Sequence, residues 1–210
     1  MKVEYFSMKG QWQENEDFLA YKFLDEKTLV AVLSDGIGGL SLGAMAAKTA
    51  TNAICDYCVQ HYGESNIQEL LKNAFKEADD KIRAVSLQFK SNMGTATTAI
   101  IIEQEKLHCS WLGNVRIFRM IKNDPLQLNI DHVIHIGYGR TALSRCLKGI
   151  GTYHPLPYIT DNLQQGTTLY LCTDGLYQVA HSALSTFSMQ ELETLVNLPN
   201  DDASAIKISL

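Results

Sequence analysis

Residues 29–39 read Leu-Val-Ala-Val-Leu-Ser-Asp-Gly-Ile-Gly-Gly, and this stretch decides how the chain folds. Its first five residues form an unbroken apolar run, which is typical of a strand buried on both faces. The run ends in Asp35, and Gly36 follows at once. Such an aspartate has a rigid backbone, and the glycine lets a cation approach its carbonyl oxygen closely. The stretch therefore predicts a strand that delivers hard-oxygen ligands to its end.

One later segment shares this arrangement, an acidic pair lies just before the last expected strand, and an acidic cluster precedes the second strand. Residues 169–175 read Leu-Tyr-Leu-Cys-Thr-Asp-Gly, residues 200–204 read Asn-Asp-Asp-Ala-Ser, and residues 14–17 read Glu-Asn-Glu-Asp. Two divalent cations about 3.5–4 Å apart can activate a bridging water for displacement at phosphorus. The candidate ligands for such a pair are Asp17, Asp35, Gly36, Asp174 and Asp201, with Glu16 assisting. Each Asp-Gly alone is more typical of a turn, so the argument depends on their co-occurrence.

Composition excludes several classes of protein. The chain has 210 residues, which predicts one domain over 1–210, and a net charge of −5 without a basic block. It therefore offers no electrostatic surface for nucleic acid or an acidic membrane. No apolar run approaches the roughly 20 residues of a membrane-spanning helix, and the N-terminus lacks the apolar region of a signal peptide. The five cysteines fit buried thiols in a reducing cytoplasm, so we expect a cytoplasmic protein.

Periodicity predicts an α+β fold with antiparallel sheets and helices packed outside them. A helix is expected over residues 43–62, and a Ser65/Gln68 capping box is expected to start a second helix that extends to Phe89. Ser188 and Glu191 indicate one more short capped helix. Close succession of the strands between residues 97 and 131 favours antiparallel pairing. The expected strands cover residues 3–8, 18–23, 28–34, 97–104, 106–112, 115–121, 126–131, 168–172 and 205–210.

The order of these motifs resembles that of the metal-dependent Ser/Thr protein phosphatases of type 2C, the PPM family, in a compact bacterial-like form. The resemblance extends over nearly the whole chain and is specific as a combination. Its motifs are Asn15-Glu16-Asp17, Asp35–Gly39, Met93–Thr98, Gly113–Arg116, Asp131-His132, Leu143–Arg145, Thr173–Leu176 and Asp201–Ser204.

The resemblance implies a four-layer α-β-β-α sandwich, in which two antiparallel sheets pack together between helices. It also implies that a metal-activated water hydrolyses phosphoserine and phosphothreonine at a dinuclear Mn²⁺ or Mg²⁺ site. By motif position, the ligands are Asp35, the Gly36 carbonyl, Asp174 and Asp201, while Asp17 and Glu16 complete or orient the site. Asp35 and Asp174 are therefore also the expected catalytic residues.

The chain departs from the family pattern at several positions. Asn114 replaces an aspartate that helps hold a third metal, so two ions are expected and a third is doubtful. Ile37 stands where some animal members have a histidine, and Trp12 lies near the place of a phosphate-gripping arginine. The interval between His132 and Leu143 is short, which suggests that the flap beside the site is missing.

Two interpretations of the function remain open at this level. The first is an active protein phosphatase that acts on phosphorylated Ser/Thr proteins, opposes a Ser/Thr kinase and is most simply a monomer. The second is a catalytically weak pseudophosphatase that serves as a phosphoprotein-binding or regulatory module. Arg116 and Arg145 could contact phosphate or pair with carboxylates, and His132 is expected to be structural.

Overall fold

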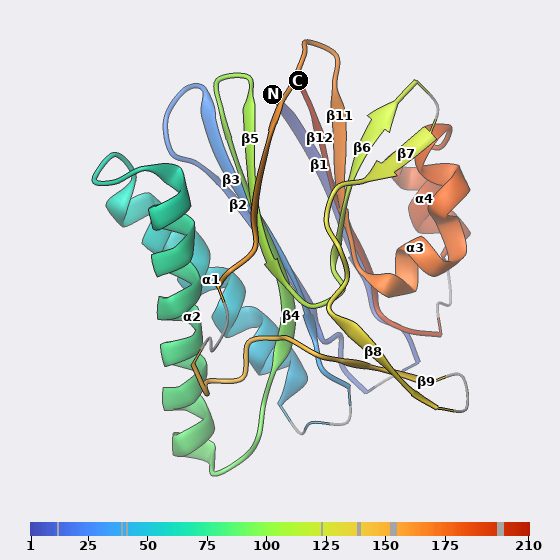
Figure 1. Ribbon diagram of the computed structural model, residues 1–210. Coiled ribbons are helices and arrows are strands. Elements are labelled where there is room, and N and C mark those ends of the chain that lie inside the picture. The colour runs from blue at the N-terminus through green and yellow to red at the C-terminus, as the bar shows by residue number, and fades with distance from the viewer. Residues whose placement is uncertain are drawn as a thin grey trace.

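The protein is built around two five-stranded antiparallel sheets with helices outside each sheet, as the computed structural model shows (Figure 1). The structure describes residues 1–11, 13–38, 40, 42–122, 124–137, 140–151, 155–196 and 200–210. Trp12, named above for its place near the acidic cluster, lies outside the described residues. The expected four-layer α-β-β-α arrangement is confirmed.

The first sheet has the strand order β1-β12-β11-β6-β7. The second has the order β10-β5-β4-β3-β2. The strands of the first sheet are β1 (Lys2–Met8), β6 (Arg116–Ile121), β7 (Asp124–Gln127), β11 (Thr168–Cys172) and β12 (Ala203–Ser209). Those of the second are β2 (Asp17–Phe23), β3 (Thr28–Gly36), β4 (Thr95–Glu103), β5 (Lys106–Leu112) and β10 (Tyr158–Asn162).

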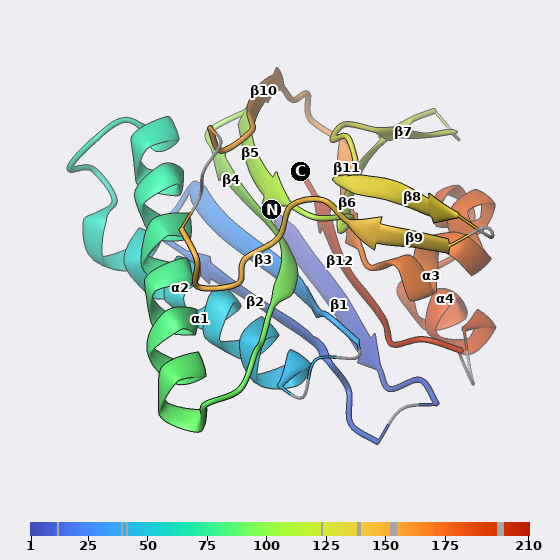
Figure 2. The same ribbon diagram turned by 60° about the horizontal axis from the view of Figure 1, so that its bottom comes forward.

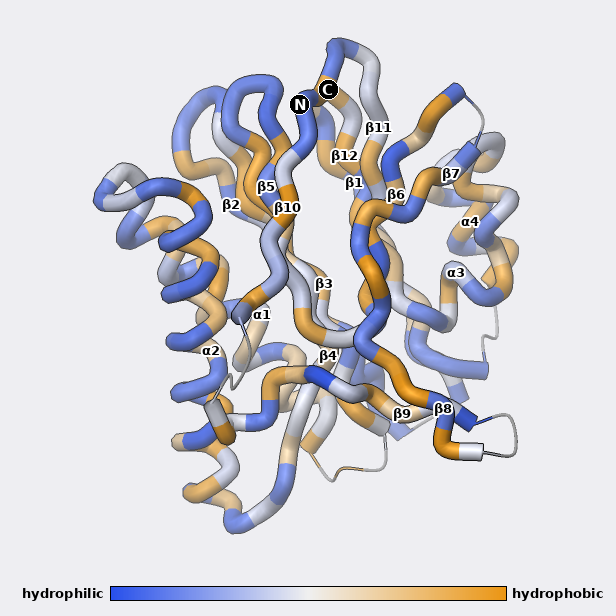
Figure 3. Tube along the Cα trace, viewed as in Figure 1, coloured by the Kyte–Doolittle hydropathy of each residue, from blue (hydrophilic) through white to orange (hydrophobic). Residues whose placement is uncertain are grey.

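Within the described residues, four helices complete the outer layers. The long pair, α1 (Gly43–His61) and α2 (Ile67–Phe89), covers the second sheet. The short pair, α3 (Asp174–Ala180) and α4 (Met189–Leu195), covers the first, with a 3₁₀ turn at His181–Ser185 between them. Apolar and polar residues alternate along α2 at helical spacing, so one face packs inward while the other meets solvent (Figure 3).

The run at residues 29–33 is fully buried, as its composition predicted. Val30 and Val32 pack under α1 and α2, whereas Leu29, Ala31 and Leu33 join the core between the two sheets. Successive side chains of a strand point to opposite faces, so one apolar run contributes to two cores. β3 is thereby held on both sides up to the residues at its end.

Two sequence-based expectations about the strands are wrong. Residues 106–112 and 115–121 do not pair with each other, because the chain crosses from β5 in one sheet to β6 in the other. The strand expected over 126–131 is β7 and ends at Gln127. Beyond it, Asn129 is buried and its side chain bonds the backbone of Val115 and Ile117, which replaces strand pairing.

The helix starts were predicted with mixed success. The second helix is capped by Asn66, whose side chain accepts from the Glu69 amide, and not by the expected Ser65/Gln68 box. Asparagine is as good an N-cap as serine, so the helix can begin one residue later than expected. The Ser188/Glu191 capping box is confirmed by both of its reciprocal bonds.

A hairpin outside the two main sheets was not expected. Strands β8 (Val133–Gly137) and β9 (Arg140–Leu143) form a separate two-stranded sheet. It lies across one end of the sandwich, opposite the end that carries both chain termini (Figure 1, Figure 2). In the described part of the chain, no helix is long and apolar enough to cross a membrane.

Candidate metal centre

The first two candidate ligands are cross-strand neighbours. Asp17 begins β2 and is paired directly with Asp35 near the end of β3. Side chains opposite each other in an antiparallel pair lie about 4.5–5.5 Å apart at Cβ, and like charges there repel. The sequence therefore folds two carboxylates into an arrangement that is unfavourable unless a proton or a cation is present.

The other two candidates approach from the neighbouring sheet. Asp174 is the first residue of α3, directly after β11, and Asp201 lies just before β12. A Cβ on Gly175 would lie 2.2 Å from the Asp202 carbonyl oxygen, so only glycine fits after Asp174. The glycine of this Asp-Gly pair thus allows the two segments to approach each other.

Gly36 has a similar packing role. A Cβ on it would lie 2.5 Å from the Gly43 backbone, at the start of α1, and its amide donates to the Glu16 carbonyl at 2.9 Å. Thr95 fixes the same turn, since its Oγ1 donates to the Asp35 carbonyl at 2.7 Å. Glycine at position 36 is therefore required by the close approach of α1, independently of any cation.

These segments border one pocket at the hairpin end of the sandwich. Its volume is about 480 Å³. The lining residues are Glu16, Asp35, Gly36, Ile37, Gly38, Asn114, Val133, Thr141, Ala142, Leu143, Lys148, Asp174, Asp201 and Asp202. Every candidate except Asp17 thus lines the pocket, whereas Asp17 lies beside Asp35 in the sheet but is buried at 6 % exposure and is not among the lining residues.

Burial and mutual repulsion raise the pKa values of Asp17, Asp35 and Asp174. Burial, followed by the charges of Asp17 and Asp174, raises the pKa of Asp35 well above its usual value. Burial raises the pKa of Asp17 to about 8, and the charges of Asp202 and Asp174 add to this effect. The pKa of Asp174 is also raised, first by burial and then by Asp201. A divalent cation would reverse this balance by favouring the ionised forms.

The donor atoms fit a hard cation. Asp17 Oδ1 is buried without a hydrogen-bond partner, while its Oδ2 accepts from Thr173 Oγ1 at 2.9 Å. Carboxylate and carbonyl oxygens are the ligands that Mg²⁺ and Mn²⁺ prefer, often with retained waters. Among the described residues, no three His, Cys, Asp or Glu side chains form a ready-made chelate. The carboxylates border the pocket, and their role as metal ligands stays a prediction.

Asp202 is a site residue that the sequence analysis missed as an individual. It is 5 % exposed, and its two carboxylate oxygens accept from the amides of Gly10 at 2.7 Å and Glu16 at 2.6 Å. It thereby ties the acidic cluster to the start of β12. In the sequence, only the two adjacent aspartates at 201–202 point to it. Such a pair does not show which aspartate is a metal ligand and which one binds backbone amides.

Asn114 lies in the connection that crosses between the sheets. Its Nδ2 donates to Asp174 Oδ2 at 3.3 Å, and Gln178 Nε2 donates to the same oxygen at 3.2 Å. An amide donor therefore stands where the family pattern has another carboxylate. This geometry is consistent with the expectation of two ions and a doubtful third, which stays a prediction.

The two arginines and the histidine make internal contacts. Arg116 pairs with Asp131 at 2.8 Å and stacks 3.8 Å from the Tyr177 ring. Arg145 donates to the Pro155 carbonyl at 2.8 Å. His132 stacks on Trp111 and accepts from the Gly113 amide, and burial together with Arg145 lowers its pKa to about 4. All three residues thus make contacts within the protein, and none of them is among the residues that line the pocket.

The hairpin forms one side of the pocket. Val133, Thr141, Ala142 and Leu143 from β8 and β9 all line it. The short interval between His132 and Leu143 suggested that the flap is missing. In the structure, this interval forms the β8–β9 hairpin, which borders the pocket. The absence of a larger flap stays a prediction.

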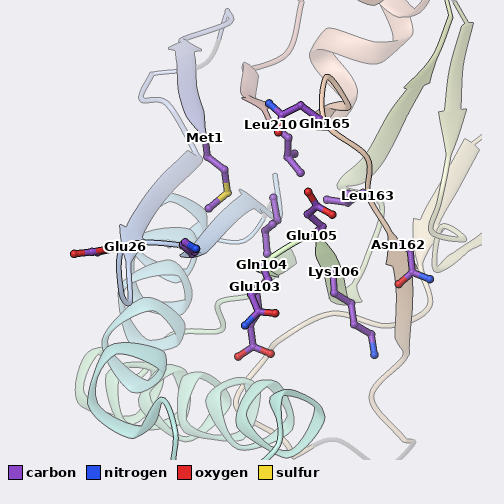
Figure 4. Close-up of a pocket in the computed structure, with 12 residues that line it drawn as sticks. Met1, Glu26, Glu103, Gln104, Glu105, Lys106, Asn162, Leu163, Gln165 and Leu210 are labelled. Carbon is purple, nitrogen blue, oxygen red and sulfur yellow. The ribbon is translucent and has the colours of Figure 1, made fainter.

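The most voluminous of the described pockets lies elsewhere. It measures about 900 Å³ and opens at the opposite end of the sandwich, where Met1 and Leu210 meet the β4–β5 turn (Figure 4). Its rim mixes Glu26, Glu103 and Glu105 with two lysines. Volume alone does not define a site, and this rim lacks the convergent carboxylates of the smaller pocket.

Comparison with known proteins identifies the family of the chain. A model of the protein phosphatase 2C family matches residues 9–207, and the chain belongs to that family. No curated protein matches it. The expected family, fold class and enzyme class are confirmed by the family model and by the shared fold of solved serine/threonine phosphatases.

Three solved structures illustrate the similarity. The Mycobacterium tuberculosis serine/threonine phosphatase PstP/Ppp superimposes with a TM-score of 0.83 at 20% identity, over 100% of this chain and 98% of that one. Stp1 from Staphylococcus aureus gives 0.84 at 18%, over 100% and 94%. The catalytic domain of PstP in complex with two manganese ions gives 0.76 at 19%, over 98% and 96%. At these identities the likeness concerns the fold.

Proposed function

We propose that this chain removes phosphate from phosphoserine and phosphothreonine in proteins, with two Mn²⁺ or Mg²⁺ ions in the 480 Å³ pocket. One observation carries the proposal. Asp35, Gly36, Asp174 and Asp201 come from three distant segments and border a single pocket, together with Glu16.

The residues divide the work as follows. Asp35, the Gly36 carbonyl, Asp174 and Asp201 would hold the ions, and Asp17 and Glu16 would complete or orient the site. Bound ions supply an activated water and neutralise charge on phosphoryl oxygens. Asp202 accepts from the Glu16 amide, and Thr95 donates to the Asp35 carbonyl. These bonds hold the two backbones, so the carboxylates of Glu16 and Asp35 would keep their positions while charge develops on the substrate.

The proposed partners are phosphorylated Ser/Thr proteins produced by an opposing kinase. We place the reaction in the cytoplasm, because the five free cysteines match a reducing compartment and four of them are buried. The chain would act as a monomer, without nucleic acid or membrane.

Phosphate release from an aryl phosphate and from phosphoserine and phosphothreonine peptides tests the proposal. Release should require Mn²⁺ or Mg²⁺, stop with EDTA and return when metal is added back. Phosphotyrosine peptides serve as the comparison for substrate class. No release at saturating Mn²⁺ would contradict the proposal.

A regulatory module that binds phosphoproteins without turnover is the second candidate. It is favoured by the two amide groups, from Asn114 and Gln178, that donate to Asp174 Oδ2. Phosphopeptide binding without release would favour it, whereas multiple turnovers per chain would exclude it.

A further inference from the structure

We propose that Lys148 binds the phosphate group of the substrate in the 480 Å³ pocket, a role that rests on the proposed function. Lys148 is the only basic residue among the described residues that line this pocket. Positive charge opposite the carboxylates is what an incoming phosphate requires.

The charges of the wall show why a cation is needed. Five carboxylates line the pocket, from Glu16, Asp35, Asp174, Asp201 and Asp202. Two divalent cations would leave this wall with one negative charge, and a phosphate monoester brings close to two more at pH 7. A protein cation on the rim therefore offsets repulsion that the metals alone leave, and its attraction strengthens as water is displaced.

Lys148 stands close to the candidate ligands through a short series of backbone bonds. Ile37, next to Gly36, donates its amide to the Gly94 carbonyl at 2.9 Å. Thr95, which follows Gly94 in the chain, forms two backbone hydrogen bonds with Leu147, at 2.9 and 3.0 Å. Lys148 Cγ packs over Gly94, since a Cβ added there would lie 3.1 Å from it. The lysine is thus held beside the end of β3.

The backbone of the lysine is anchored from the opposite side by α2. Asp79, only 4 % exposed, accepts from the amides of Lys148 at 3.1 Å, Gly149 at 2.7 Å and Gly151 at 2.7 Å. A Cβ on Gly149 would lie 2.6 Å from the Arg83 backbone, so the loop sits tightly on the helix. The main chain is therefore fixed, while the exposed side chain can follow a phosphate oxygen.

The ammonium group is available for a ligand. None of the ion pairs among the described residues includes Lys148. Its polar contact is with the Cys146 thiol, a weak acceptor that a phosphate oxygen would outcompete. Arg116 and Arg145 differ, because Arg116 is paired with Asp131 and Arg145 with a backbone carbonyl, and neither lines the pocket.

Binding of inorganic phosphate to the Mn²⁺-loaded protein, followed by titration calorimetry, tests the role of Lys148 without requiring turnover. Lys148→Met keeps the aliphatic stem and removes the charge, and should weaken phosphate affinity roughly 10-fold or more, as expected for a lost charged hydrogen bond. Lys148→Arg should restore most of it. Mn²⁺ affinity should stay equal or rise, because a positive charge leaves the rim.

Steady-state kinetics give a second readout. With an aryl phosphate, Lys148→Met should raise KM by a factor similar to the loss in phosphate affinity and change kcat little, because Lys148 contacts bound phosphate before and during reaction. Lys106→Met, at the opposite end of the sandwich, is the matched control and should match the parent. If Lys148→Met lowers the melting temperature, Lys148→Gln removes the charge with a polar replacement.

Each outcome either supports or overturns the proposed role of Lys148. Unchanged phosphate affinity in Lys148→Met, an equal loss in Lys106→Met, or no rescue by Lys148→Arg overturns the role of Lys148. A parent protein that binds phosphate through Lys148 but releases none from substrates supports Lys148 and overturns the proposed hydrolysis. A Mn²⁺-loaded parent protein that binds no phosphate overturns the inference outright.

Discussion

Asp174 stands where β11 gives way to α3, and its Oδ2 accepts hydrogen bonds from two amide groups. Asp174→Asn keeps the shape of the side chain and removes its charge, which a divalent cation needs. We expect Mn²⁺-dependent phosphate release to fall by more than the roughly 10–100-fold typical of losing an outer partner of a metal site.

Asp56→Asn, on the exposed face of α1, is the control for Asp174→Asn and should behave like the parent. Circular dichroism should show the fold unchanged in both variants. Activity near that of the parent in Asp174→Asn would remove Asp174 from the metal site.

Asn114→Asp is the second prediction at the scale of single residues. It converts a donor to Asp174 into a carboxylate that faces the same pocket. We expect higher activity at saturating Mn²⁺, with half-saturation at millimolar metal or above, because the new oxygen offers a weak additional site. A Mn²⁺ titration of phosphate release measures this.

Gln178→Glu is the matched control for Asn114→Asp, since Gln178 donates to the same Asp174 oxygen from an exposed position. An equal gain in both variants would show that added negative charge, and not position 114, is responsible. No gain in Asn114→Asp would show that a third cation does not limit the reaction.

At the scale of elements, α2 controls the loop that follows the hairpin. Asp79 accepts three amides from residues 148–151. Asp79→Ala would leave these donors without a partner and should lower the free energy of unfolding by roughly 3 kcal/mol. For a chain of this size that corresponds to a fall in Tm of about 6–12 °C.

Asp80→Ala is the comparison for Asp79→Ala, because Asp80 is the next residue of α2 and pairs with Lys76 in solvent. Exposed pairs contribute little, so its Tm should stay close to that of the parent. Similar losses in the two variants would argue against an anchoring role for Asp79.

The elements also show what the sequence could reveal. The apolar run at 29–33 could be recognised as a buried strand, because burial on both faces favours apolar side chains at successive positions. The switch of sheet between β5 and β6 was not readable, since a short connection normally indicates pairing. The β8–β9 hairpin was hidden too, because its exposed residues lack a clear alternation of polar and apolar side chains.

The sequence predicted individual candidate ligands but not how they lie relative to one another. Strand-end aspartates followed by glycine pointed to ligands, but nothing local placed Asp17 opposite Asp35 or Asp201 beside Asp174. Register and sheet order determine such neighbours, and the order of motifs supplied them by resemblance to a family. The sequence did not predict Lys148 as a site residue, because an exposed lysine in a loop has no distinctive sequence pattern.

At the scale of the whole molecule, the acidic centre links stability to pH. The pKa of Asp17 is about 8, and those of Asp35 and Asp174 are also raised, whereas an unfolded aspartate titrates near pH ~3.9. The folded, metal-free protein then binds more protons than the unfolded chain, so its stability falls as pH rises from about 4 through 8. We expect a lower Tm at pH 8 than at pH 5.5.

Mn²⁺ at about 100 times its Kd should add roughly 2.7 kcal/mol of stability and flatten this pH dependence at its upper end. Asp17→Asn should flatten it without metal. Melting curves with and without EDTA between pH 5.5 and 8 provide the measurement. A metal-free Tm that rises over this range would contradict raised pKa values for the three carboxyls.

The pairing of β1 with β12 has a consequence for how the chain is made. β1 leaves the ribosome before its partner strand β12 and before the Asp202 carboxylate that accepts from the Gly10 amide, since Gly10 and Asp202 are 192 residues apart. Loop-closure entropy opposes such distant contacts, and topologies rich in them fold slowly. Until β12 has been synthesised, β1 is an unpaired edge strand, which can aggregate or bind a chaperone. The pocket that holds the candidate ligands is completed only when β12 docks, so we expect a chain that still lacks β12 to be without the proposed metal site.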